Sequence, residues 1–114
     1  MIAHSLPNKA FGPAQSKHGA TYVVDVTFYS EKLNPVNVVI DMGLAHQVLK
    51  EVLESLNYKD LDDVGEFNDQ LTTTEFLAKH IHDRVKEAVK KEFFGNLEVT
   101  LGESHVAWAG YKGD

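Results

Sequence analysis

The chain has 114 residues, enough for one domain. Its 17 acidic and 11 basic side chains give a formal net charge of -6, and the basic residues form no stripe, so no nucleic-acid partner is expected. The absence of cysteine excludes disulfides, thiolate zinc sites and a cysteine nucleophile, and it fits a cytoplasmic protein. No apolar run approaches the roughly 20 residues of a membrane span, and the first residues lack a signal-peptide pattern, so no membrane partner is expected.

The first half of the chain begins with a strand pattern. Apolar and polar side chains alternate from Tyr22 to Tyr29, with the period of two that is typical of a strand. Asn34 and Pro35 mark a turn. The β-branched run Val36–Ile40 is consistent with a returning strand.

Two amphipathic helices are predicted in the middle of the chain. The first carries an apolar stripe from Leu44 to Leu56. Residues 57–70 are polar and lack periodicity, so an exposed connection is expected. Thr72-x-x-Glu75 reads as a capping box that opens the second helix, and Gly95-Asn96 ends it.

Two further strands complete the pattern, Leu97–Leu101 and Val106–Tyr111. Strands followed by two helices and then strands indicate an α+β fold, a four-stranded antiparallel sheet with both helices on one face, in a single domain over residues 1–114. Such a sheet leaves two open edges, and pairing with further copies of the chain would cover them.

Several short motifs occur in the order seen in one known family. They are Ile2-Ala3-His4, Lys17-His18-Gly19-Ala20-Thr21-Tyr22, Val39-Ile40-Asp41-Met42, Thr73-Thr74-Glu75 and Leu101-Gly102-Glu103-Ser104. Together they span most of the chain, and in register they resemble the 6-pyruvoyltetrahydropterin and 6-carboxytetrahydropterin synthases. The resemblance implies the T-fold, a unit that joins edge to edge into a trimeric barrel and stacks into a hexamer. It also implies a pterin-like ligand. Because the family's first strand begins well before the Ala-x-His position, we expect a short first strand or a sequence that begins late.

The family's zinc site is matched incompletely. The resemblance implies three histidine ligands, and His4 and His18 match two of them, whereas Ala20 occupies the third position. Either the two histidines line a polar pocket without metal, or His105 or Glu103 completes a zinc site. The histidines at positions 46, 80 and 82 are expected on helices and in solvent.

The family's proton-transfer groups are also replaced. Its cysteine base corresponds to Ala14, or to Gly12 under a longer spacing, and its Asp-His pair corresponds to Asn57-Tyr58. Tyr58 alone can titrate, but an unperturbed phenol with a pKa of about 10 is a poor base at neutral pH. The pair also reads as a helix exit that serves packing.

The substrate-binding positions are retained. The resemblance assigns Glu103 to the pterin anchor, because a carboxylate can accept two hydrogen bonds from the 2-amino group and the adjacent ring N–H. The other reading is a strand-end residue paired with lysine or water. Thr73, Thr74 and Glu75 match a segment that contacts the ring, although the capping function explains Glu75 equally well.

Three hypotheses follow. In the first, the chain is a pterin-binding homologue whose synthase activity is lost or altered. In the second, it is an active lyase-type synthase that acts on dihydroneopterin triphosphate with a substituted zinc ligand and base. In the third, it is a structural oligomer with a vestigial pocket. Replacement of residues in three catalytic elements, beside a retained anchor, favours the first.

Overall fold

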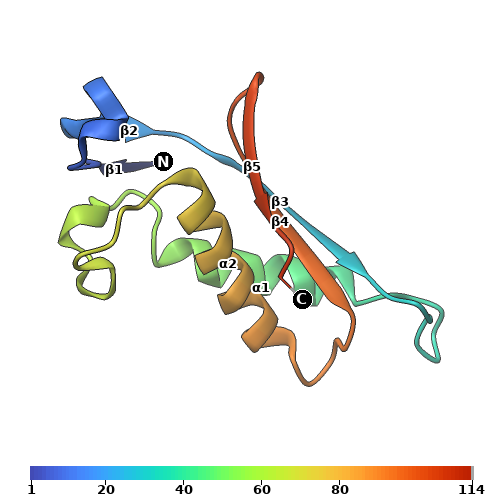
Figure 1. Ribbon diagram of the computed structural model, residues 1–114. Coiled ribbons are helices and arrows are strands. Elements are labelled where there is room, and N and C mark those ends of the chain that lie inside the picture. Colours follow the sequence, from blue (N-terminus) through green and yellow to red (C-terminus); the bar gives the residue numbers. More distant parts are fainter. Residues whose placement is uncertain (114) are drawn as a thin grey trace.

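The computed structural model describes residues 1–113 and contains five strands and two α-helices (Figure 1). In chain order these are β1 (Ile2–His4), β2 (His18–Ala20), β3 (Val23–Tyr29), α1 (Met42–Glu54), α2 (Thr74–Val89), β4 (Asn96–Ser104) and β5 (Ala107–Tyr111). Short 3-10 turns cover Lys9–Gln15, Leu61–Asp63 and Gly65–Phe67. The predicted α+β class is confirmed.

The strands form two separate sheets, which corrects the expected single sheet of four. One has the order β3-β4-β5 and the other pairs β1 with β2, and all pairs are antiparallel. The predicted strand Val36–Ile40 is absent from the described chain and is a loop instead. Asn37 has a φ of 65°, and the Asn34 side chain accepts the backbone N–H groups of Val36 and Val38, so this segment turns instead of extending.

Both helices cover one face of the three-stranded sheet, as predicted (Figure 1). The apolar side chains of β4 point to this face, where Leu97, Val99 and Leu101 are fully buried. Helix α2 packs against β4 and β5, and α1 packs against α2. The core therefore lies between one sheet face and the helix pair.

The start of α2 differs from the predicted capping box. The N-cap is Thr73, whose hydroxyl accepts the backbone N–H of Phe76, so the cap begins one residue later than expected. This shift leaves Thr72 outside the cap and buried. The change matters for the site because it gives Thr72 a different partner.

The connection between the helices is partly buried, which corrects the expectation of an exposed linker. Its two 3-10 turns insert Leu61 and Phe67 into the core. The expectation that all helical histidines are solvated is also wrong, because His82 is buried against the ring of Tyr111 and His80 is half-buried against Phe67. Each of these side chains gains an aromatic or apolar contact that sequence periodicity does not reveal.

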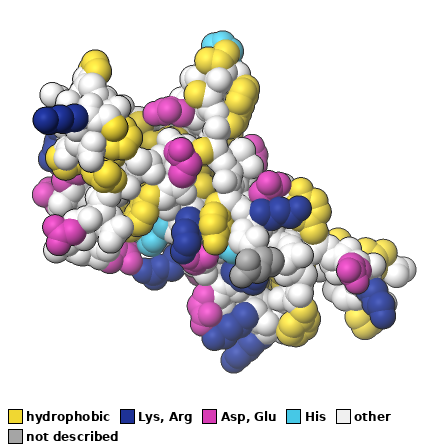
Figure 2. All heavy atoms as spheres, in the orientation of Figure 1, with side chains coloured by type: hydrophobic (Ala, Val, Ile, Leu, Met, Phe, Trp, Pro, Cys, Tyr) yellow, Lys and Arg dark blue, Asp and Glu magenta, His cyan; other side chains and the backbone are white. Residues whose placement is uncertain are grey.

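Charged groups of both signs are interspersed over the face shown in Figure 2, with apolar patches between them. Within residues 1–113, neither α-helix is long and apolar enough to cross a membrane.

Candidate functional site

The small β1–β2 ribbon brings the two motif histidines together. His4 is paired with His18 in the antiparallel register, so their side chains lie on the same face of the ribbon. Their ring centroids are 4.6 Å apart in an edge-to-face arrangement, and His4 is only 2% exposed. The predicted convergence of these imidazoles is therefore present in the fold.

Hydrogen bonds orient both rings. His18 Nδ1 lies 2.8 Å from the carbonyl oxygen of Ser16, and because a carbonyl only accepts, this nitrogen donates and Nε2 keeps its lone pair. His4 Nδ1 shares a hydrogen bond of 3.0 Å with the Thr72 hydroxyl. Burial, and next the nearby His18, lower the pKa of His4, which favours a neutral ring.

The third histidine position of a zinc site holds a methyl group. Ala20 is on the same ribbon face as His18 and is paired with Ile2. Among residues 1–113 there is no group of three histidine, aspartate or glutamate side chains that could hold a metal ion, so neither Glu103 nor His105 completes a site within this chain. Zinc sites use at least three protein ligands, and a single chain therefore does not fit the ion.

An ion-pair network fixes the ribbon from outside. Asp62 accepts hydrogen bonds from the backbone and side chain of Ser5, and Lys17 pairs with both Asp60 and Asp62. Burial alone would raise the pKa of Asp62, but these hydrogen bonds outweigh it and lower the pKa below its usual value. The residues next to His4 and His18 are thereby tied to one turn.

Glu103 lies at the end of β4, close to the histidine pair. The β3–β4 pairing ends with Val23 opposite Gly102, and Tyr22 and Glu103 adjoin this last pair. A β-bulge of β4 against β5 lies between Gly102 and Ser104. Burial lowers the pKa of His4 and raises the pKa of Tyr22, and the negative charge of Glu103 acts on both groups, opposing the first shift and adding to the second. The carboxylate is exposed, since it lies past the last buried residue of the strand.

The start of α2 borders the same region. Thr74 and Glu75 are the first two residues of α2, and the charge of Glu75 adds to the effect of burial in raising the pKa of the Tyr22 phenol. The hydroxyl of Thr73 is used by the helix cap, so its direct availability to a ligand is reduced. Thus His4, His18, Thr74, Glu75 and Glu103 come together from separate segments.

Tyr58, the predicted substitute base, points away into solvent. It has a φ of 61° and is 83% exposed, and its backbone N–H donates to the carbonyl of Met1. Within residues 1–113 its hydroxyl makes no hydrogen bond with a site residue. The structure therefore does not bring it to the cluster.

Two residues of this region were missed by the sequence analysis, namely Thr72 and Tyr22. Two adjacent threonines precede α2, and since one helix needs one N-cap residue, the other was free for a different role. Tyr22 appeared in a motif and in a strand pattern but was given no function, although it ends the row that faces the helices. Its position next to Glu103 follows from the pairing of β3 with β4, which the sequence does not specify.

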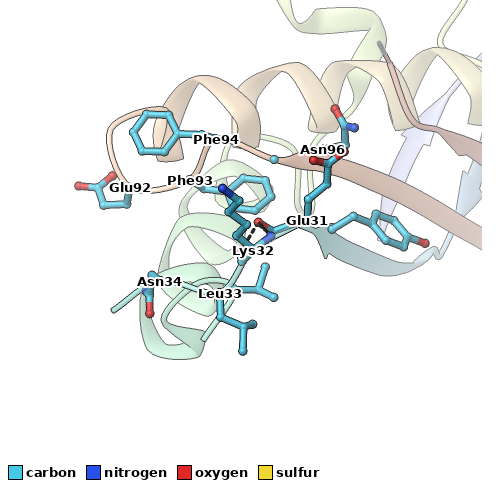
Figure 3. Close-up of a pocket in the computed structure, with 12 residues that line it drawn as sticks. Glu31, Lys32, Leu33, Asn34, Glu92, Phe93, Phe94 and Asn96 are labelled. Carbon is cyan, nitrogen blue, oxygen red and sulfur yellow. Dashed lines mark hydrogen bonds between the residues drawn. The ribbon is translucent and has the colours of Figure 1, made fainter. Parts of the chain in front are cut away.

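An apolar cavity of about 160 Å³ lies behind Tyr22. Its lining includes Ile2, Leu61, Leu77 and Leu101. A larger hollow of about 700 Å³ lies at the opposite end of the sheet, where the ring of Phe93 lies beside the loop that carries Lys32 and Leu33 (Figure 3). It contains none of the motif residues, so we place the candidate site at the Tyr22 end.

The family assignment rests on the whole chain. The family model described as 6-pyruvoyl tetrahydropterin synthase matches residues 1–114. The chain belongs to this family. The resemblance noted from the motifs is thus confirmed for the family, and with it the T-fold of the single chain.

Individual relatives agree with the assignment. Over 90 residues the chain is 31% identical to 6-carboxy-5,6,7,8-tetrahydropterin synthase of Bacillus subtilis (strain 168), an alignment that covers 74% of this chain and 58% of the relative. The chain thus spans somewhat over half the length of that relative. The solved structure of Caenorhabditis elegans 6-pyruvoyl tetrahydropterin synthase superposes with a TM-score of 0.84 at 23% identity, covering 99% of this chain and 89% of the other. At that identity the match establishes the fold.

Proposed function

We propose that this chain is a pterin-binding member of the 6-pyruvoyl tetrahydropterin synthase family whose usual synthase reaction is lost or altered. The observation that supports the proposal is that the expected ligand-binding residue is kept, whereas one of the three zinc ligands is replaced. Glu103 lies beside His4, Tyr22 and the start of α2, whereas Ala20 stands at the third zinc position. Residues that match the family's ring-binding positions support binding, and the replacement of the zinc ligand and of the proton-transfer groups argues against the usual reaction.

Glu103 anchors the ligand in this proposal. A carboxylate at the open end of the sheet accepts the 2-amino group and the adjacent ring N–H of a pterin as a bidentate pair. Thr74 and Glu75 supply further polar contacts, and Thr73 orients the first turn of α2 through its cap. His4 and His18 line the site as imidazoles, with the free Nε2 of His18 as an acceptor or proton carrier.

The proposal extends to assembly. Strands β3 and β5 each pair only with β4 among the described strands, so both edges of the sheet offer unpaired backbone groups. We propose that copies of the chain pair along these edges into a barrel, as a trimer or a hexamer. Such an assembly would also enclose the exposed carboxylate of Glu103.

The test is Glu103→Gln with Glu98→Gln as the matched control. Glutamine keeps the shape of glutamate but turns an N–H donor toward a ligand N–H, so neopterin binding should weaken by about 2–4 kcal/mol, with the oligomer unchanged. Glu98 lies in the same strand and accepts from Tyr29 away from the site, so its substitution should leave binding unchanged. Calorimetric titration measures both, and equal affinity of the wild type and Glu103→Gln would refute the anchor.

The alternative is an active lyase-type synthase that acts on dihydroneopterin triphosphate. The contact between the rings of His4 and His18 supports this alternative, because two oriented imidazoles could transfer protons. A turnover assay with dihydroneopterin triphosphate decides between the two. Under the main proposal no conversion at a synthase-like rate is expected, and such conversion would establish the alternative.

A further inference from the structure

Tyr22 lies next to Glu103 in the candidate site, but the proposed function gives it no part in ligand binding. It lies in the two-residue gap between β2 and β3 and adjoins the last β3–β4 pair, Val23 with Gly102, at the end where Glu103 follows Gly102. The charges of Glu103 and Glu75 both act on the Tyr22 phenol, so the carboxylate, the phenol and the first turn of α2 border one region.

The Tyr22 ring and its hydroxyl have different surroundings. The ring is half-buried and lines the apolar cavity together with Leu77 and Leu101. The hydroxyl lies at the polar end of the ring, where the charges of Glu103 and Glu75 act on its pKa. A buried apolar body with a polar tip fixes the direction of the O–H group, since the ring has few rotamers.

The hydroxyl has donor capacity to spare. A phenol carries one O–H donor, and within residues 1–113 no hydrogen bond uses the proton of Tyr22, so this proton remains for another partner. Burial raises the pKa of Tyr22, and the charges of Glu103 and Glu75 act in the same direction. The phenol is therefore a neutral donor throughout the neutral pH range.

The chemistry of the ligand edge matches this arrangement. In a 2-amino-4-oxopyrimidine ring, the 2-amino group and the ring N–H form a donor pair, and acceptor atoms flank this pair on both sides. A carboxylate that accepts from the pair leaves a flanking acceptor in need of a donor. A phenol beside the carboxylate supplies that donor.

We propose that Tyr22 is a second ligand-contacting residue, whose O–H donates to the acceptor that flanks the donor pair held by Glu103. The inference rests on the proposed pterin-binding function and deepens it. Together the two residues select fused heterocycles that carry the 2-amino-4-oxopyrimidine edge. A ring that lacks either the donor pair or the flanking acceptor loses one of these contacts.

The test is Tyr22→Phe, which keeps the ring in the apolar cavity and removes only the hydroxyl. Neopterin should bind about 5- to 10-fold more weakly, as expected for the loss of one hydrogen bond. Tyr111→Phe is the matched control, because Tyr111 is also a half-buried tyrosine whose ring faces α2, but it packs on His82. Its affinity should stay within 2-fold of the wild type, and thermal unfolding should show both variants folded.

A second ligand makes it possible to test pterin binding by Glu103 separately from the contact proposed for Tyr22. Lumazine carries a carbonyl in place of the 2-amino group, so wild-type protein should prefer neopterin if Glu103 is the anchor. Absence of neopterin binding, or equal binding of lumazine, overturns the proposed function. A clear preference for neopterin together with equal neopterin affinity of the wild type and Tyr22→Phe overturns only the assignment of Tyr22.

Discussion

Single residues decide what chemistry this site supports. The ribbon retains the geometry that would hold an ion, since His4 and His18 oppose each other and position 20 lies on the same face. The side chain at position 20 is a methyl group, which offers no lone pair. With histidine at position 20 the ribbon would offer three imidazoles to a metal ion, whereas with alanine it offers only the two hydrogen-bonded imidazoles of His4 and His18.

Restoring the third ligand should restore metal binding. We expect Ala20→His to raise zinc affinity by at least 10-fold, because residues 18 and 20 point to one face of β2 and a third imidazole completes the minimal ligand set. Elemental analysis of metal-free protein after equilibration with zinc measures this. Ala20→Leu adds similar bulk without a ligand atom and serves as the control. Near one tightly held zinc per wild-type chain would contradict the expectation.

The sequence indicated candidate site residues but not all the contacts that they make in the fold. His4, His18 and Glu103 are recognisable because they lie in motifs, and the i, i+2 spacing of residues 18 and 20 predicts a shared face. The partnership of His4 with Thr72 joins positions far apart in the chain, so only the packed structure shows it. Tyr58 lies outside the cluster because a left-handed turn directs it into solvent.

At the level of elements, periodic segments were predictable and irregular ones were not. Helix α1 and strands β3 and β4 follow apolar patterns, because their buried faces repeat at regular intervals. The run Val36–Ile40 has strand propensity but lacks a partner strand, and local Asn34 hydrogen bonds determine its shape. Likewise, burial of Leu61 and Phe67 depends on tertiary packing, which a polar segment does not signal.

The turn from α2 into β4 depends on a glycine. A Cβ at Gly95 would lie 2.0 Å from the carbonyl oxygen of Tyr29 and 2.9 Å from the Phe93 ring, so Gly95→Ala must displace backbone. We expect a loss of about 2–4 kcal/mol in the free energy of unfolding, measured by urea denaturation.

Gly65→Ala is the control for this turn. A Cβ at Gly65 meets no atom within 4 Å, so the change should stay within about 0.5 kcal/mol. Equal stability of the two variants would contradict this expectation, because it would mean that a Cβ at position 95 fits without displacing the backbone.

The whole chain is elongated for its size. Its extents are 51 × 27 × 22 Å and its radius of gyration is 15.4 Å, whereas a compact domain of about 100 residues has a radius of about 13 Å. Large apolar side chains such as Val23, Phe94, Val106 and Trp108 are exposed. Together with two open sheet edges, this shape suits a subunit that is completed by neighbours.

Sedimentation velocity tests the assembly directly. For a chain of 12.7 kDa we expect a species with the mass of three or six chains, because barrel closure removes every free edge. Dilution should dissociate it in a single step to smaller units. A monomer at micromolar concentration would contradict the assembly and would also leave Glu103 open to solvent.

The β4–β5 hairpin gives the molecule a built-in optical reporter. Trp108 is the only tryptophan of the chain, it lies across Gly102 on the sheet face opposite the helices, and its indole is 62% exposed. Fluorescence excited at the indole therefore reports on this hairpin alone, without a label. A shift of its emission to shorter wavelength would signal that water has left the outer face, so subunit docking could be followed in real time.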